Sequence, residues 1–121
     1  MITLRTAWEL DPDPRNRLIS HIDMLISGKE RVGNDGCPVG SLSQEVHKSI
    51  GCHTDVLPDA LKDHHGWLSE QFRLMGKKDA DALAGQFFSI IQGACLLASS
   101  FNDPEIFVEQ GERLKDWVKS L

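Results

Sequence analysis

Residues 79–101 read DADALAGQFFSIIQGACLLASSF and form the most apolar stretch of the chain. Its large apolar side chains recur at helical spacing, from Leu83 through Phe87 and Ile91 to Phe101. Together they cover about half of the helix circumference, which is wider than the stripe of an ordinary surface helix. We therefore expect a helix from Asp79 to about Phe101 that packs against neighbours on two sides.

Cap and turn residues divide the rest of the chain into further helices. Asp13 and Pro14 predict a helix that runs to about Ser27 and stops at Gly28, since aspartate caps helix N-termini and proline suits the first helical position. The other expected elements are a helical stub over residues 2–9, a short helix opened by Ser41 and Gln44, a helix from Thr54 or Asp55 to Gly76, and a last helix capped by Asn102 or Asp103. No run of alternating β-branched residues predicts a strand. The expected fold is all-α, with about five helices after the stub in one domain spanning residues 1–121.

The composition is that of a globular protein. Of the 121 residues, 40% are hydrophobic and 26% are charged, which favours one compact domain over disorder. The first ten residues contain Arg5 and Glu9 and do not resemble a signal peptide, and the apolar run from Phe87 to Ala98 is too short to span a bilayer. We expect a cytoplasmic protein without membrane contact.

The net charge and the cysteine spacing argue against two features, a nucleic-acid binding surface and a disulfide framework. The net charge is -5, and the 13 basic residues are scattered, so these residues offer no surface for phosphate groups of nucleic acid. Cys37, Cys52 and Cys95 lack paired spacing, which favours reduced thiols over a disulfide framework. Direct DNA binding by this chain is therefore not expected.

Three pieces of sequence resemble the C-terminal half of TetR-family transcriptional regulators. They are the run Gly36-Cys37-Pro38-Val39-Gly40-Ser41-Leu42-Ser43-Gln44-Glu45-Val46, the triplet Gln92-Gly93-Ala94, and the helix junction Asn102-Asp103-Pro104-Glu105. The resemblance covers nearly the whole chain, with residues 1–10 at the end of the helix that normally leads to the DNA-binding part. That part, an N-terminal helix-turn-helix, is not visible here. The resemblance implies the sensing half of a transcriptional repressor, which reaches DNA only through a helix-turn-helix module missing from this chain.

The resemblance also implies a homodimer. The last two helices, within residues 79–121, are expected to pair with their copies as a four-helix bundle, and the small residues Gly85, Gly93, Ala94 and Ala98 would allow close approach. The expected interface residues are Phe87, Ile90, Ala94, Leu97, Ala98, Phe107, Gly111, Leu114, Trp117 and Val118. The alternative is a monomer in which the wide apolar arc is entirely core.

A pocket for a small, largely apolar effector is the second implication. Its candidate residues lie on the stub and on the helices that precede or include the most apolar stretch: Trp8, His21, Met24, Leu25, Leu61, His64, Leu68, Phe88, Ile91 and Cys95. His64 lies on the apolar face of its helix, where a neutral imidazole would bond either a ligand or a neighbouring protein group. The aromatic candidates can equally be core residues.

Other classes of site receive less support. Cys37, Cys52, His53, His64 and His65 do not show the paired spacing of zinc ligands, and neighbouring helical residues point about 100° apart. Ser41 lacks the G-x-S-x-G context of a nucleophile, no glycine-rich phosphate loop is present, and no carboxylate pair stands out. We therefore expect no enzyme, metal or cofactor. The alternative function is a stand-alone helical domain that binds a ligand or another protein.

Overall fold

The computed structural model describes residues 7–29 and 56–121 of the chain. These residues form helix α2 (Pro14–Ser27), helix α5 (Val56–Leu74), helix α6 (Ala80–Ser100) and helix α7 (Pro104–Ser120), with a short helical turn at residues 7–9. No strand occurs in these two ranges, which confirms the all-α prediction. The predicted stub residues 2–6, the short helix opened by Ser41 and the proposed caps Thr54 and Asp55 lie outside the described residues.

Helices α2 and α7 begin in the same way. Asp13 and Asp103 adopt extended backbone conformations, and each side chain accepts a hydrogen bond from the backbone N–H two residues later. Pro14 and Pro104 follow as the first helical residues, where the missing N–H has no intrahelical partner to lose. The two Asp-Pro pairs therefore define both starts, as predicted.

Helices α5 and α6 end in left-handed residues that redirect the chain. Gly76 has φ 83°, and the Lys77 N–H donates back to the Phe72 carbonyl. Asn102 has φ 51°, and the Asp103 N–H donates to the Ala98 carbonyl. Each hydrogen bond spans six residues and caps the helix C-terminus, because it satisfies a carbonyl that has no partner within the helix. Asp103 thus terminates α6 with its N–H and starts α7 with its carboxylate.

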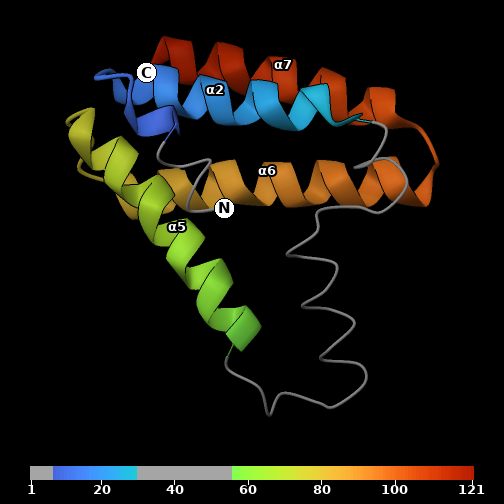
Figure 1. Cartoon of the computed structure of the whole chain (residues 1–121), viewed down its shortest axis with the longest axis horizontal. Helices are drawn as coiled ribbons and strands as arrows, with labels where there is room; N and C mark the ends of the chain where they lie inside the picture. Colours follow the sequence, from blue (N-terminus) through green and yellow to red (C-terminus); the bar gives the residue numbers. More distant parts are fainter. Residues whose placement is uncertain (1–6, 30–55) are drawn as a thin grey trace.

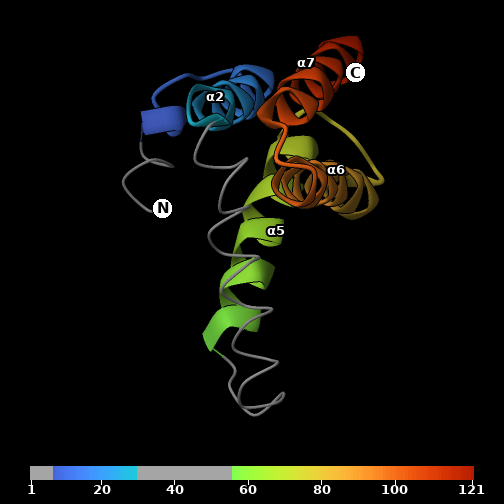
Figure 2. The same ribbon diagram turned by 90° about the vertical axis from the view of Figure 1, so that its right-hand side faces the viewer.

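Three of the helices run nearly along one direction and the fourth crosses them (Figure 1). Helix α7 lies beside both α2 and α6 and runs antiparallel to each, whereas α5 is steeply inclined to all three (Figure 2). Helix α5 contacts α6 and α2, so the four helices form a closed circuit in which α2 is held between α7 and α5. The short turn that carries Trp8 lies at the start of this arrangement, next to α2.

The hydrophobic core fills the space enclosed by this circuit. Its largest fully buried side chains include Phe72 from α5, Phe87 from α6, Phe107 from α7, and Leu18 and Ile22 from α2. Each helix thus contributes an apolar face, as the periodicity of the sequence predicts. Helix α6 packs against both α5 and α7, which confirms its expected contacts on two sides.

Helix α6 extends beyond the apolar run of residues 87–98 at both ends. It has 21 residues and is long and apolar enough to cross a membrane by length and composition alone. Core helices of soluble proteins satisfy the same criterion. Only 33% of its most apolar window is buried, so much of its apolar surface is not covered within the described residues.

Candidate functional site: a buried histidine pair among aromatic rings

Two buried histidines from different helices contact each other in the core. His21 of α2 and His64 of α5 are each 6% exposed, and their Nε2 atoms lie 3.1 Å apart. Both occupy the apolar face of an amphipathic helix, His21 beside Leu18 and Ile22 and His64 one turn before Leu68. At this distance one Nε2–H donates a hydrogen bond and the other Nε2 accepts it. The contact therefore joins α2 to α5.

Aromatic rings from three elements surround the two imidazoles. The Trp8 ring lies 4.5 Å from the His21 ring between centroids, and Trp67 lies 5.3 Å from Trp8. Phe87 stacks on His21 at 6.0 Å, and Phe88 meets His64 edge to face at 5.2 Å. We call Trp8, His21, His64, Trp67, Phe87 and Phe88 the histidine-aromatic cluster. It draws residues from the N-terminal turn, α2, α5 and α6 into one contact group.

Polar side chains tie the N-terminal turn and α2 to α5 around the cluster. The Trp67 indole Nε1–H donates to the Glu9 carboxylate at 2.8 Å. Arg17 donates from Nε to the Asp11 carbonyl at 2.7 Å and from a terminal nitrogen to the Gln71 Oε1 atom at 3.1 Å. The Gln71 side chain is 2% exposed and also donates to the Trp67 carbonyl. These bonds fix the position of Trp8 relative to α5.

The structure brings together only some of the residues predicted to bind an effector. Trp8, His21, His64 and Phe88 meet in the histidine-aromatic cluster, whereas Leu68, Ile91 and Cys95 are buried in the hydrophobic core. Met24, Leu25 and Leu61 are half-buried, and Leu25 packs against that core. Effector binding stays a prediction.

Sequence reasoning missed two members of this cluster. Trp67 lies three residues after His64, on the same helical face, and this spacing is a signal that was available. Phe87 was assigned to the dimer interface instead. The pairing of His21 with His64 joins residues 43 positions apart, and no local pattern predicts it.

Most residues predicted to form the dimer interface are buried within the single chain. They are Phe87, Ala94, Ala98, Phe107, Gly111, Leu114 and Val118. Gly111, for example, lies against Ile22 and Ile26 of α2. The role of these buried residues in a dimer stays a prediction. Ile90 and Trp117 are half-buried, and Leu97 is exposed. A wide apolar arc shows that a helix has several neighbours, but not which of them belong to the same chain.

A different face of α6 is left uncovered by the described parts of the chain. Leu96, Leu97 and Phe101 are 56%, 44% and 64% exposed, although each is large and apolar. Gly93 lies one turn before Leu97, and a Cβ added there would meet nothing within 4 Å. We call Gly93, Leu96, Leu97 and Phe101 the α6 apolar face. The helix carries no charged residue between Asp81 and Asp103.

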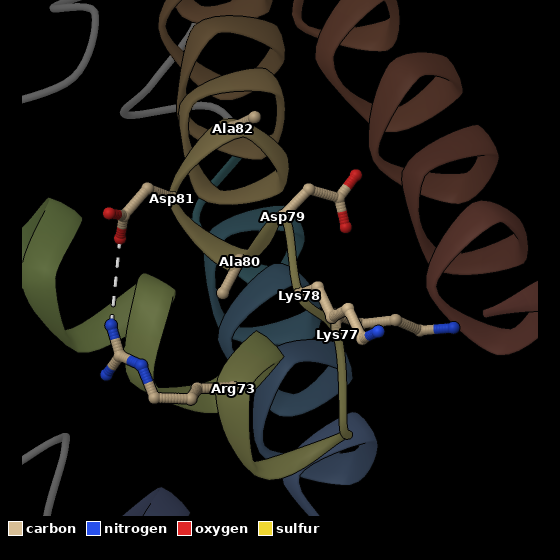
Figure 3. Close-up of a pocket in the computed structure, with 7 residues that line it drawn as sticks. All are labelled: Arg73, Lys77, Lys78, Asp79, Ala80, Asp81 and Ala82. Atoms are coloured by element: carbon tan, nitrogen blue, oxygen red, sulfur yellow. Dashed lines mark ion pairs between the residues drawn. The ribbon is translucent and has the colours of Figure 1, made fainter.

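A shallow hollow of about 340 Å³ lies at the start of α6. Arg73, Lys77 and Lys78 line it together with residues 79–82. Figure 3 shows Arg73 pointing toward Asp81, at 3.7 Å, whereas Lys77 and Lys78 extend on the other side of the connection. Because the cations do not converge and two aspartates share the hollow, it is a poor anion site.

Metal binding finds no further support among residues 7–29 and 56–121. No group of three or more His, Cys, Asp or Glu side chains in these ranges is placed to hold a metal ion. Cys37, Cys52 and His53 lie outside the described residues. His64 is buried in the cluster while the adjacent His65 is half-buried beside Gly85, so the two imidazoles face different surroundings.

Comparison of the chain with known protein families and with curated proteins gives no match. The site must therefore be interpreted from its own chemistry. The cluster offers flat apolar surfaces together with two imidazoles that can donate or accept hydrogen bonds.

Proposed function

We propose that the chain is a homodimeric regulatory domain of the TetR type that senses a small, largely apolar molecule. The sequence motifs at residues 36–46, 92–94 and 102–105 and an all-α fold support this proposal. Control of transcription would require a helix-turn-helix module in addition to these residues, since a net charge of -5 does not favour direct contact with DNA. The proposed role of this chain is recognition of the effector and of a second copy.

The observation that carries the proposal is the α6 apolar face. Leu96, Leu97 and Phe101 expose large apolar surface on a helix whose other side belongs to the core. Contiguous exposed apolar surface on a soluble protein commonly marks an interface. In a dimer with two-fold symmetry each residue meets the same surface of its copy, so like charges would oppose each other. The α6 apolar face avoids this repulsion because it lies in an uncharged stretch.

The histidine-aromatic cluster supports the sensing part of the proposal. Ligand pockets combine apolar and aromatic walls with a few polar groups that fix orientation. Trp8, Trp67, Phe87 and Phe88 supply the walls, and His21 and His64 supply the polar groups. The rings pack against one another here, so a ligand would enter by displacing one of them. Trp8 is the candidate, because it sits on a single helical turn.

Native mass spectrometry of the purified chain tests both parts at once. The expected result is a species of twice the 13.5 kDa chain mass, with added mass when a small apolar molecule co-purifies. A dimer without ligand would support the interface alone, and added small aromatic compounds would then be screened by Trp fluorescence. A monomer that binds no small molecule at any accessible concentration would contradict the proposal. It would favour a helical domain whose α6 apolar face meets a different protein.

A further inference from the structure

The contact between His21 and His64 depends on the number of protons that the two imidazoles carry. Each neutral imidazole has one ring N–H, so a neutral pair can place a single hydrogen between the two Nε2 atoms at 3.1 Å. One extra proton can be added on an Nδ1 atom without breaking this bond, which then has a charged donor. A second extra proton leaves an N–H on both Nε2 atoms, and the two donors then face each other.

We propose that the His21–His64 contact is an acid-sensitive latch between α2 and α5, which stays closed until both imidazoles are protonated. Opening separates two like charges that would otherwise be buried within a few ångströms of each other. It also exposes both rings to water, which solvates an imidazolium better than the protein interior does. Acid therefore favours the open state.

The surrounding rings tolerate one positive charge better than two. Phe87 and Trp67 present ring faces to His21 and His64, and such faces attract a cation. This attraction supports a single shared charge in the closed state. It does not restore the hydrogen bond that the second proton removes, and it does not cancel the repulsion between two imidazolium groups.

Some charged groups near His21 and His64 oppose protonation of the pair and others favour it. Arg17 lies one turn before His21 and bonds Gln71 of α5, so its charge opposes protonation. Glu9 of the N-terminal turn bonds Trp67, and Asp63 precedes His64 on α5; both carboxylates favour protonation. Helix α6 faces the pair with Phe87 and Phe88 and has no charge between Asp81 and Asp103. On α7, the helix beyond α2, Lys115 is paired with Asp23.

Release of the latch would first loosen the N-terminal turn. Trp8 packs on His21 and on Trp67, so separation of the two histidines removes one of its supports. Helix α2 remains packed on α7 through Gly111, Ile22 and Ile26. The expected acid form keeps the α6–α7 hairpin and loses order at Trp8 and along the α2–α5 contact.

Urea unfolding measured between pH 8 and pH 5 tests the latch. An unfolded chain protonates both histidines below about pH 6.5, whereas the closed fold accepts at most one extra proton on the pair. The unfolded state then binds more protons, so stability rises with pH and falls on acidification. Below about pH 6.5, the unfolding constant should increase about tenfold for each unit by which pH falls, per excluded proton. In His64→Gln the part of this pH dependence that comes from the histidine pair should disappear.

The matched control is His65→Gln, which removes a neighbouring histidine on α5 that is half-buried and outside the cluster. It should retain the pH dependence of the wild-type chain. Equal pH dependence in the wild type, His64→Gln and His65→Gln would overturn the proposal.

Nuclear magnetic resonance of the wild-type chain provides a second test that does not depend on a variant that folds. The nitrogen chemical shifts of the two imidazoles should show that both rings share the first added proton. Uptake of the second proton should coincide with a change in the chemical shift of the Trp67 indole N–H, which donates a hydrogen bond to Glu9. Two independent titrations with an unchanged Trp67 signal would refute the latch.

Discussion

Gly111 of α7 lies so close to Ile26 of α2 that a Cβ added to the glycine would come within 2.9 Å of the isoleucine Cδ1 atom and 3.1 Å of its Cγ1 atom. Ile22 Cγ2 would lie at 3.4 Å. The half-buried Ile26 side chain would have to shift, and the fully buried Ile22 beside it leaves it little room to do so. The absence of a side chain at Gly111 therefore sets how closely α2 and α7 approach.

We expect Gly111→Ala to lower the free energy of unfolding by about 1 kcal/mol, because the overpacking outweighs the gain in helix propensity. The matched control is Gly66→Ala in α5, where a Cβ would meet nothing within 4 Å; it should raise stability by about 0.5–1 kcal/mol. Urea midpoints at equal protein concentration compare the two. Removing the Ile26 Cδ1 atom with Ile26→Val should reduce the cost of Gly111→Ala, and strict additivity would show that this contact is not the cause.

The α6 apolar face can be tested by adding charge to it. Leu97→Glu should convert the dimer to a monomer while preserving helical content, because two-fold symmetry would place the two new carboxylates near each other. The control is Leu74→Glu, since Leu74 is 55% exposed at the end of α5 and away from this face. Light scattering after gel filtration gives the mass of each. Ala94→Arg, by contrast, should unfold the chain, because Ala94 is 4% exposed in its core. A Leu97→Glu variant that stays dimeric would exclude this face as the interface.

The two left-handed helix ends predict different sensitivities of stability to substitution. Gly76→Ala should lower stability by about 1 kcal/mol, because a side chain at φ 83° meets the adjacent carbonyl. Asn102→Gly should change stability by no more than about 0.5 kcal/mol, because asparagine already tolerates this conformation. Thermal unfolding with far-ultraviolet circular dichroism would measure both. If Gly76→Ala were neutral, the turn between α5 and α6 would have to adopt another conformation.

The ion pair of Lys115 in α7 should make the free energy of unfolding depend on pH in the alkaline range. Its hydrogen bond to the Asp23 carboxylate, at 2.7 Å, is the main cause that raises the pKa of the ammonium group above its usual value, and Glu112 adds to it against partial burial. Because the pKa of Lys115 is higher in the folded than in the unfolded state, its charge contributes its full stabilisation below the pKa of the unfolded state, about 10.4. That stabilisation is lost as pH rises through the pKa of the folded state. We expect Asp23→Asn to cost about 0.5 kcal/mol at pH 7–9, and this difference to shrink above pH 10.4.

The control for this pair is Glu109→Gln, which removes an exposed partner of Arg113. It should change stability little at any pH in this range. A difference between Asp23→Asn and the wild type that is constant up to pH 12 would contradict the role of Lys115.

The helix starts could be predicted from sequence because their causes are local. In both Asp-Pro pairs the cap and the first helical residue are neighbours, so the sequence predicts Asp13 as one cap and Asn102 or Asp103 as the other, of which the structure shows Asp103. The ends at Gly76 and near Asn102 follow from the same kind of signal.

Relationships between distant residues could not be predicted in this way. The periodicity of α6 indicated several packing partners but did not identify them, and no local pattern predicted that Gly111 of α7 lies against Ile22 and Ile26 of α2. The contact of His21 with His64 likewise joins residues 43 positions apart. A pattern along one helix specifies the chemistry of a face, whereas the identity of its partner depends on how the whole chain is folded.

The closed circuit of helices has a consequence for the order in which the chain folds. Helices α5, α6 and α7 contact their neighbours in sequence across short connections, whereas the helices that α2 contacts, α7 and α5, both lie far from it in the sequence. Docking of α2 must therefore close long loops, whose entropy cost rises with length and slows the formation of distant contacts. We expect the three consecutive helices to assemble first and α2 to join last, so that the histidine pair forms only once the rest of the fold is in place.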